Sequence, residues 1–414
     1  MSERLADHTT TRVGGPARAW VTARTEAEAI EAVRAADAAG EPLFVLGGGS
    51  NTLMADAGFP GTVVRLAFEG IHVLDGPLPG EGETPPAGDG ARSADHEGEA
   101  VVVRIAAGHP WDDAVAWTVA HGLGGIEALS GIPGSAGATP VQNVGAYGAD
   151  VSQVLVALRA WDREAGDVVE LTPADLRFGY RDSVIKRSML ETGAPSPRWI
   201  VLSIDLRLRR ASSDAEPTVP VRYGQLAAAL DVEEGAHAPL AVVRREVLAL
   251  RAAKGMVSDP ADPDTWSTGS YFTNPIVPAS VRASLPDGAP AFAAGQAEDG
   301  TPLVKLSAAW LIDRAGFAKG FGLPEVAPRE GGPDGRGADG TGLAGGRASV
   351  STKHTLAMTN RGDATTEDVL TVARTVRDGV RERFGVELHP EPMIIGTSLG
   401  PLTFVRDTAP PGVL

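Results

Sequence analysis

Two glycine-rich stretches are candidates for ligand binding, and the first is the loop Gly47-Gly48-Gly49-Ser50-Asn51. It follows the apolar run 43–46, which is typical of a short buried strand. Glycines after a strand let backbone N–H groups approach a phosphate, and Ser50 and Asn51 add side-chain hydrogen bonds. The loop is not the dinucleotide fingerprint, because Thr52 takes the third glycine position, and no Gly-Lys-Ser/Thr follows as in a Walker loop. A tight turn without a ligand is the alternative interpretation.

The second stretch spans residues 122–148, contains many glycines and carries almost no charge. Such a segment does not form a regular helix, and its backbone amides are suited to wrap a large polar ligand. Disorder is the alternative, although the interspersed apolar residues Leu129, Ile132 and Val141 argue against it. The candidate ligand contacts here are Gly131, Pro133, Gly134, Ser135, Gly137, Ala138, Gln142, Asn143, Gly145, Ala146 and Tyr147.

Two further motifs carry an arginine and a serine. Arg181 lies in Tyr180-Arg181-Asp182-Ser183, where its neighbours can hold a guanidinium rigidly for an anion. A structural Arg–Asp pair explains the same spacing.

Ser270 follows Gly269, with no nucleophile elbow and no nearby His, so it is better suited to donate a proton than to be acylated. A serine in an ordinary turn is the alternative.

Glu391 lies between Pro390 and Pro392, which fix the backbone and so preorganise its carboxylate. An exposed loop glutamate is the alternative.

No metal site is predicted, because the chain has no Cys and its eight His residues show no short ligand spacing.

The elements that must position these groups follow from hydrophobic periodicity and capping signals. Thr25 with Glu28 forms a capping-box pattern that opens a helix ending at Gly40. The other predicted helices are 111–121, 239–254 and 365–384, and the predicted strands are 43–46, 63–66, 101–105, 154–161, 200–208, 386–388 and 393–395. We interpret the segments 76–99, 286–300 and 328–346, which are rich in Gly, Pro, Ala or acid, as mobile surface loops.

Composition narrows the class of protein. The chain has 414 residues and a net charge of −16, which argues against general affinity for nucleic acid or anionic lipid. No apolar run of about 18 residues predicts a membrane span, and no secretory signal is visible at the first residues. The absence of Cys removes thiolate and disulfide chemistry and fits the cytoplasm.

In this order, the motifs resemble the UDP-N-acetylenolpyruvoylglucosamine reductase (UDP-N-acetylmuramate dehydrogenase) family. The resemblance runs from His8 to Gly396 and rests on the two glycine stretches, 180–183, 269–275, 308–320 and 390–392. It implies an α+β fold, with an FAD-binding module of the vanillyl-alcohol-oxidase (PCMH) type and a C-terminal α/β substrate-binding domain. The expected boundaries are 1–225 for the FAD-binding region, with subdomains of about 1–75 and 76–225, and 226–414 for the substrate domain.

The resemblance also implies a reaction. NADPH would give a hydride to non-covalently bound FAD, which would then pass it to C3 of UDP-N-acetylglucosamine-enolpyruvate, a step in peptidoglycan precursor synthesis that serves cell-wall biogenesis, cell shape and cell division. Arg181 and Glu391 would stabilise an enolate-like intermediate, and Ser270 would protonate C2. A fixed guanidinium where negative charge grows supplies about 3 kcal/mol. Glu391 helps only if it is protonated or orients a donor, since two anions repel each other.

Three further residues are assigned to substrate by the resemblance. Tyr223 matches a substrate-closing tyrosine of one subtype, Asn274 a substrate-binding position, and Lys254 a basic position near the UDP diphosphate. The family often has Lys where this chain has Thr273, so another residue must supply that cation or it is missing. We expect a cytoplasmic monomer.

Two other functions are open at this point. A flavin oxidase of the same fold would use O₂ on an alcohol or sugar, and lack of NADPH oxidation would favour it. A flavin- or UDP-sugar-binding protein without turnover would bind a ligand and catalyse nothing. The joint presence of Arg181, Ser270 and Glu391 argues against that second function.

Overall fold

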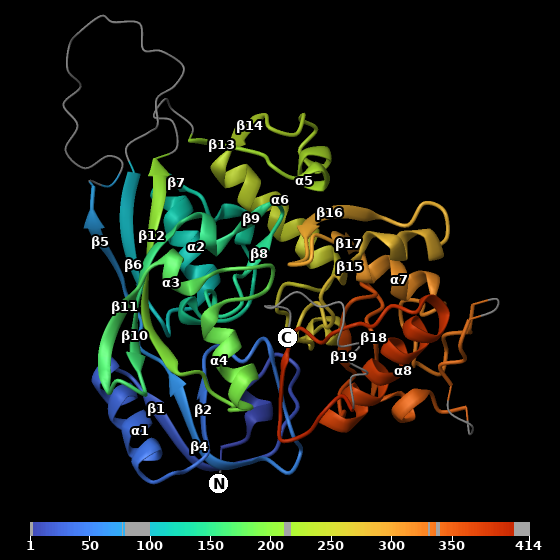
Figure 1. Ribbon diagram of the computed structural model, residues 1–414, viewed down its shortest axis with the longest axis horizontal. Helices are drawn as coiled ribbons and strands as arrows, with labels where there is room; N and C mark the ends of the chain where they lie inside the picture. Colours follow the sequence, from blue (N-terminus) through green and yellow to red (C-terminus); the bar gives the residue numbers. More distant parts are fainter. Residues whose placement is uncertain are drawn as a thin grey trace, which may run out of the picture. The chain divides into compact units, whose positions relative to one another are not determined.

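The computed structural model describes residues 3–76, 78, 100–210, 217–329, 332–336 and 340–400 (Figure 1). Helices and strands are mixed along the chain, as expected of an α+β fold. Two compact units are present, and both are discontinuous in sequence. Unit 1 comprises Met1–Trp20, Gly49–Val63 and Ala253–Leu414, and unit 2 comprises Val21–Gly48 and Val64–Ala252.

Unit 2 is built on a six-stranded antiparallel sheet. Its order is β11-β10-β12-β6-β5, and β7 also pairs with β12. The strands are β5 (Ile71–Asp75), β6 (Ala100–Ala106), β7 (Leu123–Gly124), β10 (Leu155–Asp162), β11 (Asp167–Leu171) and β12 (Trp199–Arg210). Figure 1 shows the long strands β6, β10, β11 and β12 side by side.

The core of unit 2 forms around β12, which is buried along most of its length. Ile204 of β12 stands opposite Ile105 of β6 on one side and Leu158 of β10 on the other, and all three are fully buried. Each such side chain contributes about 1.5–3 kcal/mol of burial free energy. The predicted strands in this region are therefore confirmed, with ends shifted by one to a few residues.

The helices of unit 2 begin and end where capping chemistry allows. In α1 (Glu26–Ala38) the Thr25 hydroxyl accepts a 3.1 Å hydrogen bond from the Glu28 amide, and the chain leaves the helix at Gly40 with φ of +63°. The other helices are α2 (Trp111–Ala120), α3 (Pro173–Leu176), α4 (Val184–Thr192), α5 (Gly224–Ala229) and α6 (Leu240–Ala253).

Residues 217–252 form a small subdomain within unit 2. Strands β13 (Thr218–Pro220) and β14 (His237–Pro239) pair antiparallel, and α5 and α6 pack with them. Val219, Leu226, Val243 and Val247 are buried at the centre of this separate core.

The chain passes from one unit to the other within β1 (Ala17–Ala23) and β4 (Phe59–Leu66), and again after Gly48 and after Ala252. These strands form a three-stranded sheet in the order β1-β4-β2, with β2 at Leu43–Leu46.

Unit 1 joins segments that are remote in sequence. Strand β3 (Thr52–Met54) pairs in parallel with β20 (Met393–Ile395), about 340 residues later in the numbering. Its other strands are β15 (Ile276–Pro278), β16 (Ala291–Gln296), β17 (Pro302–Leu306), β18 (Ala348–Val350) and β19 (Met358–Asn360). Helices α7 (Ala308–Arg314) and α8 (Thr366–Phe384) complete it, and α8 buries Val369, Val376 and Val380 in the core.

Three expectations need correction. Residues 386–388 do not form a strand, since the chain there runs as an irregular segment between Gly385 and Pro390. The 286–300 segment contains β16, which pairs with β17 and so is not a mere loop. Within 328–346, Gly335 is buried, and a Cβ on it would lie 2.9 Å from the Phe321 ring, so this stretch is packed in part. The predicted loop 76–99 lies almost wholly outside the described residues.

The units divide the chain at positions other than residue 225. The discontinuity arises because β3 pairs with β20, which draws residues 49–63 into the C-terminal unit. The assignment of 1–225 to cofactor binding and 226–414 to substrate binding remains a prediction about function.

A buried carboxylate organises the polar interior of unit 1. Asp264 is 5% exposed and accepts hydrogen bonds from the Ser351 hydroxyl (2.8 Å), the Thr352 amide (2.8 Å) and the Arg361 guanidinium (2.9 Å). Burial raises the pKa of Asp264, but these hydrogen bonds and the Arg361 charge outweigh burial, so its pKa lies below the ordinary value.

We therefore predict that Asp264→Asn lowers the unfolding free energy at pH 7 by about 3 kcal/mol, because the buried Arg361 loses its counter-charge. A depressed folded-state pKa stabilises the fold at pH values above about 3.9, the unfolded value, and this contribution is lost as pH falls through the folded-state pKa. Urea unfolding from pH 7 down to about pH 2 measures this loss. The gap between wild type and variant should narrow toward the acid end, and a constant gap would contradict the assignment.

Candidate functional site

The two glycine stretches meet in unit 2. A Cβ added to Gly48 would lie 2.4 Å from the Gly134 Cα, and one added to Gly47 would lie 2.6 Å from the Ser135 Oγ. At Gly48 only glycine fits, because an added Cβ would collide with the Gly134 backbone; at Gly47 the near atom belongs to the Ser135 side chain. Strand β2 delivers the first stretch to this point, so two of the predicted ligand-binding segments lie against each other.

The second stretch is ordered by backbone hydrogen bonds to the segment between β6 and α2. The amides of Ala136 and Gly137 donate to the carbonyls of His109 and Ala107, both at 2.9 Å. The Trp111 amide donates to the Gly134 carbonyl at 3.0 Å. Disorder, the alternative drawn from the sequence, is therefore excluded for this stretch.

Two buried polar atoms beside these loops have no hydrogen-bond partner among the described residues. They are the Ser135 Oγ and the His109 Nδ1, and Pro110 and Ser135 form a β-bridge between their two segments. Buried polar groups are almost always hydrogen-bonded, so these two atoms are suited to bind a polar ligand. His109 was not predicted as a binding residue, although its place between a strand and a helix start was a usable signal.

Gly48→Ala should abolish retention of a ligand at this place, because the added methyl collides with the Gly134 backbone rather than with a movable side chain. The matched control is Gly166→Ala in the β10–β11 turn, where φ is +69° but nothing lies within 4 Å of the added Cβ. The control should cost about 1 kcal/mol of stability from backbone strain alone and leave ligand content unchanged. Ligand content of the purified proteins, with their melting temperatures, checks the pair, and a fully loaded Gly48→Ala protein would contradict it.

Tyr147 is displayed by a tight hairpin. Strands β8 (Gly145–Ala146) and β9 (Ala149–Asp150) are joined by Tyr147 and Gly148, with φ of +50° and +82°. Positive φ at both central residues matches the twist of a two-residue hairpin. The Tyr147 ring meets that of Tyr223 edge-on with centroids 5.7 Å apart, so the structure brings these two predicted residues together.

Asn143 uses its side chain within the protein. Its Oδ1 accepts from the Ser152 amide at 3.0 Å, and its Nδ2 donates to the Gly179 carbonyl at 3.3 Å. The residue thereby ties the second glycine stretch to the segment that precedes Arg181.

Arg181 is held by backbone carbonyls in unit 2. Its Nη2 donates to the Gly145 carbonyl at 2.7 Å and its Nη1 to the Asn143 carbonyl at 3.3 Å. Its φ of +56° is rare for a side chain of this size and costs about 1 kcal/mol or more, a feature that gathers at functional sites. Asp182 forms its ion pair with Arg187.

In unit 1, the segments of Ser270 and Glu391 run alongside each other. Phe272 and Pro390 form a β-bridge, and the Glu391 amide donates to the Tyr271 carbonyl at 2.8 Å. The Asn51 Nδ2 donates to the Glu391 carbonyl at 3.3 Å. Three sequence-predicted residues are thus brought into one part of unit 1.

The predicted substrate residues Asn274 and Lys254 also lie in unit 1. Asn274 Oδ1 accepts from the Ala308 amide at 2.9 Å, so this side chain caps the start of α7. Burial, together with the nearby charges of Lys254 and Lys319, lowers the pKa of His354 to about 4. His354 is neutral at pH 7, and the two lysines make this locality positive. Lys319 is thus a candidate for the cation that Thr273 does not supply.

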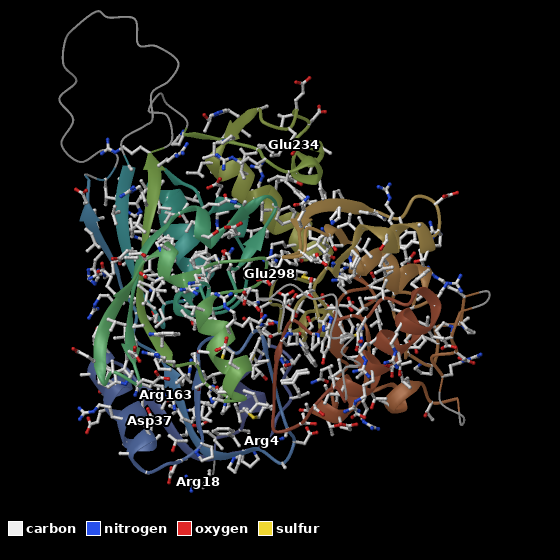
Figure 2. All side chains as sticks on the ribbon, viewed as in Figure 1. Arg4, Arg18, Asp37, Arg163, Glu234 and Glu298 are labelled. Atoms are coloured by element: carbon white, nitrogen blue, oxygen red, sulfur yellow. The ribbon has the colours of Figure 1, made fainter. Side chains whose placement is uncertain are left out.

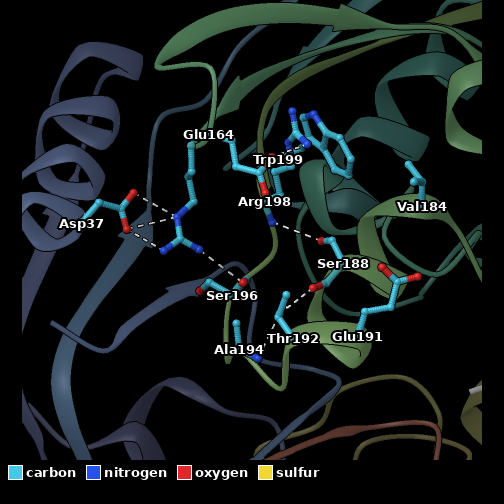
Figure 3. A pocket seen from close by; sticks show the side chains of 11 residues that line it. Asp37, Glu164, Val184, Ser188, Glu191, Thr192, Ala194, Ser196, Arg198 and Trp199 are labelled. Carbon is cyan, nitrogen blue, oxygen red and sulfur yellow. Dashed lines mark hydrogen bonds and ion pairs between the residues drawn. The ribbon is translucent and has the colours of Figure 1, made fainter. Parts of the chain in front are cut away.

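A pocket of about 420 Å³ in unit 2 lies apart from all the predicted residues (Figure 3). Arg163 on its wall donates to Asp37 at 3.0 Å and to the Pro197 carbonyl at 3.2 Å, and Figure 2 also shows Asp37 and Arg163 adjacent. Arg198 on the same wall donates to Asp162 at 2.9 Å. Both arginines thus form hydrogen bonds within the protein. We interpret the pocket as a packing gap where α1 and α4 meet the sheet, and not as a ligand site.

Two kinds of feature are absent from the described ranges. No cluster of three or more His, Asp or Glu residues in them is arranged to hold a metal ion. Among the helices they contain, none combines the length and apolarity needed to cross a membrane.

Comparisons with known proteins decide the family. Residues 17–172 match the FAD binding domain family, and residues 336–395 match the UDP-N-acetylenolpyruvoylglucosamine reductase C-terminal domain. The UDP-N-acetylenolpyruvoylglucosamine reductase of Nocardia farcinica is 48% identical over 402 residues, covering 96% of this chain and 89% of that one. The chain belongs to the UDP-N-acetylenolpyruvoylglucosamine reductase family.

Further relatives agree on the family and on the fold. The UDP-N-acetylenolpyruvoylglucosamine reductase of Mycolicibacterium gilvum is 46% identical over 399 residues, covering 95% of each chain. The crystal structure of the reductase from Thermus caldophilus is similar with a TM-score of 0.55 at 24% identity, over 95% of this chain and 99% of that one. Both glycine stretches lie within the FAD binding domain match, so the expected FAD-binding fold and cofactor are confirmed.

Proposed function

We propose that this protein reduces UDP-N-acetylglucosamine-enolpyruvate to UDP-N-acetylmuramate with NADPH, as the names of its full-length relatives support. The observation that carries the proposal is the meeting of the two glycine stretches inside the FAD binding domain match, with the buried Ser135 hydroxyl unpartnered among the described residues. We further propose that the enzyme works in the cytoplasm as a monomer and that its product enters cell-wall synthesis.

The residues at this place fit FAD. Gly47 and Gly48 let the first glycine stretch pack directly against Gly134 and Ser135, and the buried Ser135 hydroxyl can donate to a phosphate oxygen. Held by these residues, FAD would supply hydride transfer from NADPH to C3 of the enolpyruvyl group. The chain has no Cys, so a covalent bond to FAD through a cysteine is excluded, and we propose that FAD binds non-covalently.

Arg181 binds the substrate carboxylate in this proposal. Its guanidinium is held by the carbonyls of Asn143 and Gly145, so it is positioned before negative charge develops on the substrate. A preorganised cation loses nothing to reorganisation during the reaction, and such groups contribute about 3 kcal/mol.

Ser270 donates the proton to C2. Gly269, with φ of +75°, and the hydrogen bond from the Tyr271 amide to the Leu356 carbonyl (2.7 Å) fix the backbone on both sides of the serine. A serine hydroxyl is a weak acid, so it gives its proton only to a strongly basic enolate held close to it. Glu391 acts as a protonated donor or orients one, since an ionised carboxylate would repel that of the substrate.

Tyr223, Lys254 and Asn274 bind the UDP-sugar. Tyr223 is 44% exposed, so its ring is accessible to a substrate, while Lys254 with Lys319 offers positive charge to a diphosphate. Asn274 is held in place by the hydrogen bond that its Oδ1 accepts from the Ala308 amide at 2.9 Å.

The proposal is tested by following NADPH consumption with FAD-loaded protein, with and without the enolpyruvyl UDP-sugar, and by mass analysis of the product. Consumption that depends on the sugar and yields a product two mass units heavier supports it. Consumption of O₂ with an alcohol or sugar, and none of NADPH, would instead support a flavin oxidase. Bound flavin with neither reaction would leave a binding protein without turnover.

A further inference from the structure

The start of α2 holds the second glycine stretch at three points. The Asp112 Oδ1 accepts from the Gly131 amide at 2.6 Å. The neighbouring Trp111 donates from its backbone to the Gly134 carbonyl at 3.0 Å and from its Nε1 to the Leu129 carbonyl at 3.2 Å. Gly131 and Gly134 have φ of +72° and +124°. Because glycine adopts many backbone conformations, contacts from outside the segment are needed to hold it in this one.

Asp112 is itself held by the 217–252 subdomain. Arg244 of α6 donates to both oxygens of Asp112, from Nη1 at 2.7 Å and from Nη2 at 2.9 Å. The Arg244 side chain is 16% exposed and that of Asp112 36%. A bidentate guanidinium–carboxylate pair fixes both position and orientation, which a single contact does not.

Two arginines near Asp112 both favour its ionised form. Arg251 follows Arg244 by seven residues, so both lie on one face of α6. Burial raises the pKa of Asp112, but Arg244, the Gly131 amide and the Arg251 charge outweigh burial and keep the carboxylate ionised near neutral pH. Burial lowers the pKa of Arg251, and Tyr147, one of the predicted cofactor contacts, acts on this pKa in the opposite direction.

We propose that Asp112 is a positioning residue for the cofactor loop 131–135, and that Arg244 makes FAD binding depend on the subdomain that carries Tyr223. This inference rests on the proposed function, because it takes residues 131–135 as part of the FAD site. Asp112 does not touch the cofactor in this account. It keeps the Gly131 and Gly134 backbone in the conformation that the phosphate-facing loop requires.

A helix N-terminus favours any acidic residue, so a control must separate that effect from positioning. Asp113 lies in the same first turn of α2 and is exposed, and Arg245 is the exposed neighbour of Arg244. Asp113→Asn and Arg245→Met therefore match Asp112→Asn and Arg244→Met in charge and helix position.

The experiment measures the FAD dissociation constant of each apoprotein by flavin fluorescence, with its melting temperature. Asp112→Asn and Arg244→Met should each weaken FAD binding by about tenfold or more, and the double variant no further, because both break one pair. Arg244→Lys should recover only part of the affinity, because the planar fork is lost. Both controls should stay within about twofold of wild type, since neither removes a contact to the loop.

Other outcomes would overturn the inference. If the pair variants melted earlier but bound FAD with unchanged affinity at low temperature, the pair would be structural only. If the controls weakened binding as much as the pair variants, helix-end charge would explain the effect. A wild-type apoprotein that binds no FAD would instead overturn the proposed function, so the two failures are distinguishable.

Discussion

Ser270→Ala is expected to slow the substrate-dependent step by about 10³-fold, because a positioned acid contributes on the order of 10²–10⁴-fold. The change should leave the fold intact, since no described hydrogen bond uses the Ser270 hydroxyl and the Tyr271–Leu356 and Glu391–Tyr271 hydrogen bonds are backbone only. FAD content and the bleaching of flavin absorbance by NADPH should match wild type. Stopped-flow absorbance after addition of the enolpyruvyl sugar measures the slowed step.

Ser258→Ala serves as the matched control. Ser258 is an exposed serine in the same unit, and its loss should change neither half of the reaction. If the flavin absorbance of Ser270→Ala returned at the wild-type rate, another group would have to deliver the proton.

Arg181→Ala should slow the same substrate-dependent step by about 10²–10³-fold, because the fixed positive charge facing the substrate carboxylate is removed. Arg181→Lys should recover only part of the rate. A lysine side chain has one nitrogen, whereas the planar guanidinium donates from two nitrogens to the Gly145 and Asn143 carbonyls and is fixed in orientation by both. Single-turnover rates at saturating sugar, with sugar affinity measured in parallel, check this.

Backbone strain must be separated from charge in that test. Arg181 has φ of +56°, so any replacement inherits a strained conformation. Arg177 is exposed and has φ of +45°, which makes Arg177→Ala a control for strain without loss of the substrate contact. Full recovery by Arg181→Lys would mean that simple charge is enough and that the fork plays no part.

Local sequence signals predict those helices whose caps are formed by residues at their own ends. Thr25 and Glu28 fix the start of α1, and Thr365 with Asp368 forms a capping box at the start of α8, which ends at Gly385 with φ of +67°. Alternating burial in β6 and the buried run of β12 also follow from neighbouring residues. Such features need only a few consecutive side chains, so they are readable without the fold.

Contacts between remote residues were not readable in this way. The pairing of β3 with β20 and the capping of α7 by Asn274 join segments far apart in sequence, and nothing local marks them. The Ala- and Gly-rich sequence of β16 indicates a loop, and only the pairing of this segment with β17 makes it a strand. Asp112 and Arg244 stand 132 positions apart, so their pair had no sequence signal.

Glycine and proline mark backbone shape directly, so the segments that carry the predicted site residues can be identified from the sequence, while the site itself stays a prediction. The meeting of Gly48 with Gly134 and the Phe272–Pro390 bridge place predicted segments together. The roles of Arg181, Ser270 and Glu391 came from the family resemblance and stay predictions.

The central claim, that one flavin site takes reducing equivalents from NADPH and gives them to the enolpyruvyl sugar, is tested most directly by an anaerobic absorbance spectrum. The purified protein is recorded alone, after NADPH, and after the sugar. We expect an oxidised-flavin spectrum that bleaches with NADPH and returns with UDP-N-acetylglucosamine-enolpyruvate. A flavin that bleaches but does not recover its colour with the sugar would contradict the assigned substrate, and a protein that binds no FAD would contradict the site itself.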